Sequence, residues 1–123
     1  MANDFTKLNI WQKAHTLTLS IYKMSRNFPK EELYSLTSQA RRAALSVELN
    51  IAEGHGRYHY LEEVKFLIIA RGSAAETQSC LLLARDLQYC SSEEAKKLFE
   101  GYVGLIKQIN SFIGYKRKEH EKG

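Results

Sequence analysis

The sequence predicts an all-α fold, an antiparallel up-and-down four-helix bundle. Its 123 residues include one proline and seven glycines, too few for the many turns of an all-β sandwich. Apolar residues recur at steps of three and four through four long segments, which is the period of an amphipathic helix. Short connections join these segments, and long helices with short connections pack as antiparallel neighbours.

A single domain over residues 1–123 is expected, because a mass of 14.1 kDa is close to the usual size of one domain. The 44% hydrophobic and 26% charged residues are ordinary globular values and argue against intrinsic disorder. No apolar run is long enough to cross a bilayer, and the N-terminus lacks the pattern of a secretory signal. We therefore expect a cytoplasmic protein with no membrane contact.

The first helix is expected over about residues 8–27. It should end before Pro29, since the residue that precedes a proline disfavours the α conformation. One of its faces carries an apolar stripe at alternating steps of four and three: Ile10, Ala14, Leu17, Ile21, Met24 and Phe28.

The second helix is expected over about residues 35–55 and ends at Gly54-His55-Gly56, a typical helix stop. Leu45, Leu49 and Ala52 project to the side opposite Val47. The helix is therefore apolar on two faces, and one four-helix monomer can easily cover only one of them.

The third helix is expected over about residues 60–89 and carries two apolar stripes. A helix that is apolar nearly all round is normally buried, so we expect burial of both. One stripe consists of Leu61, Val64, Ile68, Gly72, Ala75 and Leu82. The other consists of Phe66, Ala70, Ser73, Thr77, Cys80, Ala84 and Leu87.

A fourth helix is expected over about residues 92–117, because Ser91 and Glu94 have the spacing of a capping box. Residues 116–123 are expected to form a charged, solvated and frayed tail. Cys80 and Cys90 are expected to be reduced, since ten residues of helix separate them by about 15 Å.

Motifs for catalysis or metal binding do not occur in the sequence. The Glu-x-x-His pairs of di-iron bundles are missing. His55 and His59 are four residues apart, but they straddle the predicted turn between the second and third helices and so do not form a metal pair on one helix. There is no nucleophile elbow, Walker A motif or dinucleotide fingerprint. Gly54-His55-Gly56 is a weak phosphate-loop pattern, and a glycine-ended helix with a tight turn is the favoured interpretation. We therefore expect no enzymatic activity, no cofactor and no metal site.

The second helix carries a polar flank within about a quarter of its circumference. Glu53 precedes Arg57 by four residues, the favourable order for an ion pair. Arg71 and Glu76 interrupt the apolar third helix, where charges need partners, and an ion pair between subunits or between helices is the default. We interpret these side chains as a structural network that fixes helix pairing: Gln39, Asn50, Glu53, Arg71 and Glu76.

The chain has 18 Lys and Arg against 14 Asp and Glu, a formal net charge of +4. This modest excess suits attraction to polyanions. Adjacent arginines point about 100° apart on a helix, so Arg41 and Arg42 cannot both be buried in one seam. We expect this basic surface to bind RNA, DNA or a ribonucleoprotein, and the candidate contacts are Arg41, Arg42, Arg57, Lys65, Lys116, Arg117 and Lys118. A scaffold that binds another protein, with incidental basicity, is the alternative.

Five strings follow one another between Leu8 and Leu87: IWQKA at 10–14, FP at 28–29, QARRAA at 39–44, NIAEGHGR at 50–57 and FLIIARGSAAE at 66–76. They resemble the successive motifs of the four-helix-bundle proteins encoded in 23S rRNA intervening sequences. One position departs from the pattern: His59 stands where the family often has a Ser or Thr cap for the third helix, and an imidazole caps less well.

The resemblance implies a bacterial four-helix bundle that assembles with itself into a ring-like homopentamer. The resemblance also extends to relatives of this family, the accessory variability proteins of diversity-generating retroelements, which look like basic pentamers that bind nucleic acid and a reverse transcriptase. No enzymatic activity is established for the family. A self-assembling bundle agrees with the two apolar faces predicted for the second helix.

Overall fold

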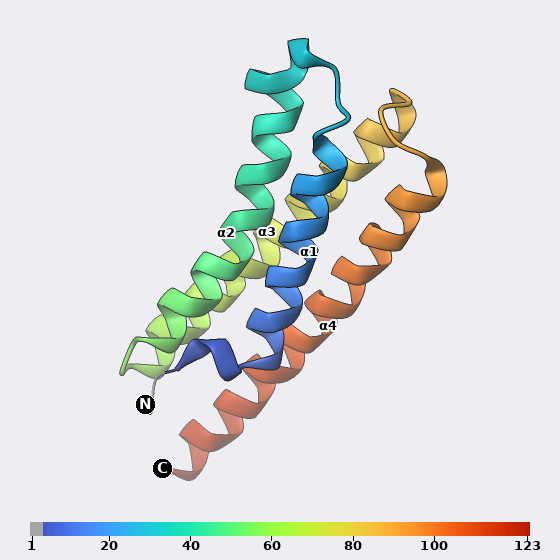
Figure 1. Ribbon diagram of the computed structural model, residues 1–123. Helices are drawn as coiled ribbons and strands as arrows, with labels where there is room; N and C mark the ends of the chain where they lie inside the picture. Colours follow the sequence, from blue (N-terminus) through green and yellow to red (C-terminus); the bar gives the residue numbers. More distant parts are fainter. Residues whose placement is uncertain (1–3) are drawn as a thin grey trace.

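A computed structural model describes residues 4–123 and confirms the all-α four-helix bundle (Figure 1). The helices are α1 (Asn9–Ser25), α2 (Ser38–His55), α3 (Tyr60–Asp86) and α4 (Ser92–Lys122). Residues 1–3 of the single predicted domain lie outside the described residues. Within residues 4–123, no helix is both long and apolar enough to cross a membrane.

The four helices surround one core. α1 packs against α2 and α4, and α3 packs against the same two helices, so α1 and α3 lie diagonally across the bundle. The central side chains come from all four helices and are fully buried or nearly so: Ile21, Val47, Ile51, Leu67, Tyr102, Leu105 and Ile109.

The connection between α1 and α2 differs most from the sequence prediction. α1 begins at Asn9 and ends at Ser25, and a 3-10 turn at Lys30–Glu32 and a π-helical turn at Leu33–Thr37 precede α2. Ser35 has non-helical dihedral angles (φ −126°, ψ −105°), so the segment from 35 to 37 does not continue into α2 as regular helix. The Glu32 carboxylate accepts hydrogen bonds from the Leu36 amide (3.3 Å) and the Tyr89 hydroxyl (2.7 Å), which fixes the connection against the end of α3.

α3 ends at Asp86, three residues before the predicted end. Gln88 takes a positive φ of 63°, and the Tyr89 amide donates back to the Ala84 carbonyl at 2.9 Å, so the chain reverses here. α3 starts after His59, whose side chain makes no capping hydrogen bond, as expected for a poor cap.

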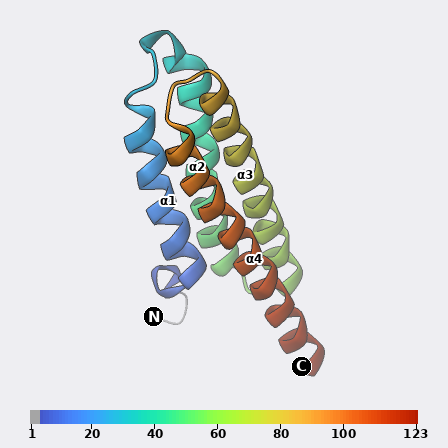
Figure 2. The same ribbon diagram turned by 90° about the vertical axis from the view of Figure 1, so that its right-hand side faces the viewer.

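α4 is longer than predicted: residues 118–122, expected as part of a charged, solvated and frayed tail, are helical, and their side chains are exposed as expected. The predicted capping box of Ser91 and Glu94 is present, and the helix continues to Lys122, past the turn between α2 and α3 (Figure 2). The His120 ring stacks on Tyr60 of α3 with centroids 4.3 Å apart. This contact holds the C-terminal turns in helical form although their charged side chains are exposed.

A single chain buries only one of the two apolar stripes of α3 and leaves the other exposed. Ala70, Thr77 and Ala84 face the core. Leu61 is 75% exposed, and on α2 Leu49 is 55% exposed. We call the exposed apolar residues of these two helices the outer α2–α3 surface: Leu45, Leu49, Leu61, Ile68, Ile69, Leu82 and Leu83.

Candidate functional site

The seven candidate cations lie at two ends of the bundle. Arg41 and Arg42 are in the first turns of α2, whereas the other five surround the turn between α2 and α3 and the C-terminal part of α4. Fifteen residues separate Arg42 from Arg57, about 22 Å of helix. We call the second group the cationic end: Arg57, Lys65, Lys116, Arg117 and Lys118.

Arg41 performs a structural task. Its Nε donates to the Ser25 hydroxyl at 2.8 Å, and its guanidinium lies 5.0 Å from the centre of the Tyr22 ring. Both partners belong to the last turn of α1, so Arg41 joins the end of α1 to the start of α2. Arg42 points to solvent and lines a groove with Gln39, Ser46 and Glu76.

Two cations of the cationic end are held by carboxylates. Arg57 lies 3.3 Å from the Glu53 carboxylate and 3.7 Å from that of Glu62, and its guanidinium covers the Phe66 ring. The Lys116 ammonium lies 3.5 Å from the Glu63 carboxylate and over the Phe112 ring.

The other three cations of this end are free of such pairs. Lys65, Arg117 and Lys118 are exposed, and none has an ion pair within residues 4–123. Pairing with a carboxylate reduces the charge that a cation offers to a phosphate, so these three are the best placed to attract an anion.

The buried Glu63 joins three helices at this end, a role that the sequence analysis missed. Its carboxylate in the first turn of α3 lies 3.7 Å from His55 Nδ1 at the end of α2 and also approaches Lys116 of α4. Glu63 precedes Leu67 and Ala70 at the helical steps of four and three that mark the buried stripe, so the spacing contained the signal.

A second buried carboxylate, Glu48 of α2, lies inside the bundle. One oxygen is 2.9 Å from His15 Nδ1 of α1, and the other has no hydrogen-bond partner among the described residues, nor has the nearby hydroxyl of Tyr102. Burial and the negative charge of Glu48 raise the pKa of Tyr102 far above its usual value. Glu48 lies in helical phase with Ala44 and Ile51, so its burial was also predictable.

The predicted polar network lies between α2, α3 and α4, with two differences. Gln39 donates to Glu76 at 2.6 Å, and Arg71 donates to the Asn110 side chain at 2.7 Å. Within residues 4–123 of one chain neither residue makes the expected interhelical ion pair, because both partners are neutral amides. These charges need no opposite charge because Glu76 is exposed and Arg71 only half-buried.

Asn50 bonds within its own helix, to the Ser46 carbonyl at 2.8 Å and to the Ser46 hydroxyl at 3.0 Å. The Ser46 hydroxyl in turn lies 2.9 Å from that of Ser73, so Asn50 reaches α3 only through Ser46. Most polar side chains between α2 and α3 thus form hydrogen bonds with one another.

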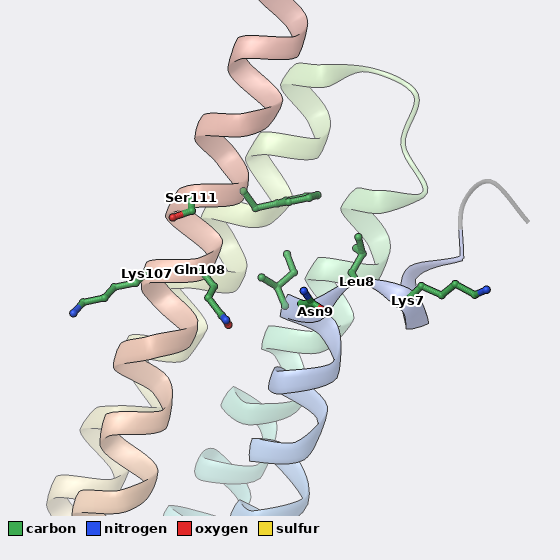
Figure 3. Close-up of a pocket in the computed structure, with 8 residues that line it drawn as sticks. Lys7, Leu8, Asn9, Lys107, Gln108 and Ser111 are labelled. Carbon is green, nitrogen blue, oxygen red and sulfur yellow. The ribbon is translucent and has the colours of Figure 1, made fainter.

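A groove between the start of α1 and α4 lies at the edge of the cationic end (Figure 3). It measures about 550 Å³, and Phe112, the ring beneath Lys116, forms part of its wall. Sequence reasoning could not find this groove, because its two walls are about 100 residues apart in the chain. The lining residues are Lys7, Leu8, Asn9, Ile10, Lys107, Gln108, Ser111 and Phe112.

Comparisons with known proteins agree with the observed fold. The 23S rRNA-intervening sequence protein family matches residues 6–111. A crystal structure of a protein of unknown function from the S23 ribosomal protein family of Bacteroides thetaiotaomicron has a TM-score of 0.76 and 22% sequence identity, covering 85% of this chain and 97% of that chain. No curated protein is significantly similar to the chain. Because the family match spans most of the sequence, the chain belongs to the 23S rRNA-intervening sequence protein family.

Proposed function

We propose that the protein is a non-enzymatic homo-oligomer that binds nucleic acid through the cationic end of each subunit. The observation that carries this proposal is the group of free cations there. Lys65, Arg117 and Lys118 are exposed without carboxylate partners in the described chain, and the adjoining groove has two more lysines on its walls. Exposed, unpaired lysines and arginines of this kind bind the phosphates of nucleic acids.

Self-association follows from the outer α2–α3 surface. Seven large apolar side chains are exposed on two adjacent helices of one chain, and contiguous apolar surface of this kind marks an interaction site. A second copy is the simplest partner, and the ring of five copies implied by the sequence resemblance would cover the surface.

A ring also strengthens nucleic-acid binding. Cyclic symmetry places the same end of every subunit on the same rim, so that several weak sites act together. Linked sites bind with higher apparent affinity than each site alone. Several subunits, each with a net charge of +4, offer a polyanion more phosphate contacts than one subunit does.

The test is the salt dependence of binding to a fluorescent RNA or DNA oligonucleotide. We expect log Kd to rise linearly with log salt concentration, because each neutralised phosphate releases counterions. The triple variant Lys65→Gln, Arg117→Gln, Lys118→Gln should weaken binding at least about tenfold and flatten the slope.

The matched control removes three exposed cations at the opposite end: Lys23→Gln, Arg26→Gln and Lys30→Gln. It should change affinity by less than about threefold, since its loss of charge acts only at long range. Affinity that does not depend on salt, or equal losses in the two triple variants, would contradict the proposal.

A protein-binding scaffold is the second candidate, because the outer α2–α3 surface could be covered by a different protein. A groove between the end of α3 and the start of α4, lined by Leu82, Phe99 and Val103, adjoins it. Recovery of one protein after nuclease treatment, lost in a Leu49→Glu variant, together with a monomeric purified chain, would favour this function over the first.

A further inference from the structure

The groove between α1 and α4 combines positive charge with an apolar wall. Lys7 belongs to a 3-10 turn, Phe5–Lys7, that precedes α1. It lines the groove with Lys107 of α4 and with Leu8, Ile10 and Phe112. Among residues 4–123, no carboxylate lines the groove, and Asp4, the nearest along the chain, accepts a hydrogen bond from the Thr6 amide at 3.1 Å. A ligand that fills this groove should therefore carry negative charge and also an apolar surface.

The polar side chains of the groove have unused hydrogen-bonding capacity. Asn9, Gln108 and Ser111 make no side-chain hydrogen bond within the described residues, and neither lysine makes an ion pair there. The groove that Arg42 lines with Gln39 and Glu76 has less unused capacity, because Gln39 and Glu76 form a hydrogen bond with each other. The α1–α4 groove thus presents two amides and a hydroxyl to a ligand.

Figure 3 shows how these side chains are arranged. Gln108 points into the space between the two helices, whereas Lys7 and Lys107 extend to opposite sides of the groove. A cation therefore lies on each side of a centre that is apolar and amide-rich.

We infer that this groove binds one nucleotide of a single-stranded nucleic acid. The base lies against Leu8, Ile10 and Phe112, the Gln108 and Asn9 amides bond to its edge, and Lys7 and Lys107 bind the flanking phosphates. The inference rests on the proposed function and deepens it, since it names the strand state. In a duplex the bases are stacked and paired, so only a single strand can place a base in a groove between helices.

A volume of about 550 Å³ lies within the range of small-ligand sites. The groove is also on the side of the bundle formed by α1 and α4, away from the outer α2–α3 surface. A copy that covers that surface therefore does not by itself fill the groove.

The experiment compares a fluorescein-labelled single-stranded RNA of about ten nucleotides with the same strand annealed to its complement. Anisotropy titrations use the full chain at about 0.1 M salt. The wild type should bind the single strand at least about tenfold more tightly than the duplex. The double variant Lys7→Gln, Lys107→Gln should lose about tenfold in single-strand affinity and lower the salt slope by about 1.4, the value for two phosphate contacts on a single strand.

The control Lys23→Gln, Lys97→Gln removes one exposed lysine from α1 and one from α4, at the opposite end of the bundle. It should retain both affinity and slope. The variant Gln108→Ala should alter the preference among poly(A), poly(C) and poly(U) strands while the salt slope stays constant, which distinguishes base contact from loss of charge.

The failures of the two proposals differ. If the wild type binds neither strand even at low salt, the proposed function fails and the inference fails with it. If it binds single strand and duplex equally, or if the two double variants lose affinity equally, nucleic-acid binding stands but the groove is not its site. Loss of binding to an acidic, Phe-containing peptide in Lys7→Gln, Lys107→Gln, without single-strand preference in the wild type, would overturn the inference in favour of a protein ligand.

Discussion

At the scale of single residues, two buried polar side chains in the core affect the stability of this bundle. Glu48 of α2 and Tyr102 of α4 are both buried in the core. Each has a side-chain oxygen with no hydrogen-bond partner in the described chain. Such atoms reduce stability because they lose hydration without compensation. The His15 contact with Glu48 at 2.9 Å offsets only part of this loss.

The first prediction concerns alkaline pH. The folded pKa of Tyr102 is raised, chiefly by burial, so the fold favours the neutral phenol. The buried neutral phenol contributes fully to the free energy of unfolding below the pKa of an unfolded tyrosine, about 10. As pH rises above that value the free energy of unfolding falls, by up to about 1.4 kcal/mol per pH unit. Urea unfolding between about pH 9 and 11 should show this loss, and Tyr102→Phe should reduce the slope. An unchanged slope in that variant would contradict the burial account.

The second prediction compares two helical glycines. A Cβ at Gly54 would lie 2.9 Å from Phe66 Cβ and 3.2 Å from the Glu63 carbonyl oxygen, whereas a Cβ at Gly114 would meet nothing within 4 Å. Gly54→Ala should lower the free energy of unfolding by about 1–3 kcal/mol through overpacking. Gly114→Ala should raise it by about 0.5–1 kcal/mol, because alanine favours helix. Thermal and urea unfolding measure both, and the same sign for the two would refute close α2–α3 packing.

At the scale of the elements, helix ends with local signals could be predicted and those with distant causes could not. The Ser91–Glu94 capping box is encoded within four residues, and the start of α4 follows from it. The π-helical turn before α2 depends on Glu32, which bonds to Tyr89 far along the chain. The last turns of α4 depend on stacking between Tyr60 and His120, a contact between residues on different helices that no local pattern reveals.

The third prediction tests the start of α4. Ser91→Ala removes the hydroxyl that accepts from the Glu94 amide at 3.0 Å and should lower the free energy of unfolding by about 1 kcal/mol. Ser92→Ala, at the neighbouring exposed position inside the helix, is the control and should change it by less than about 0.5 kcal/mol. Equal effects of the two changes in urea unfolding would show that the cap is not formed.

For the whole molecule, periodicity was sufficient to predict four antiparallel helices and a second apolar face on α2 and α3. It could not predict how cations from distant segments combine. The α1–α4 groove brings Lys7 and Lys107 onto one surface, while Arg41 and Arg57, both on or beside α2, lie at opposite ends. Only the three-dimensional structure shows that Arg57 and Lys116 are paired with carboxylates and that, within the described part of the chain, the other cations of the cationic end are not.

The central claim is that copies of the chain cover the outer α2–α3 surface of one another, so that their cationic ends act together on nucleic acid. Sedimentation equilibrium of the wild-type protein at micromolar concentration tests it most directly. The account predicts a mass that is a multiple of the 14.1 kDa chain, five copies by family resemblance, and a fall to one copy in Leu49→Glu. A stable, well-folded wild-type species of 14.1 kDa under these conditions would contradict it.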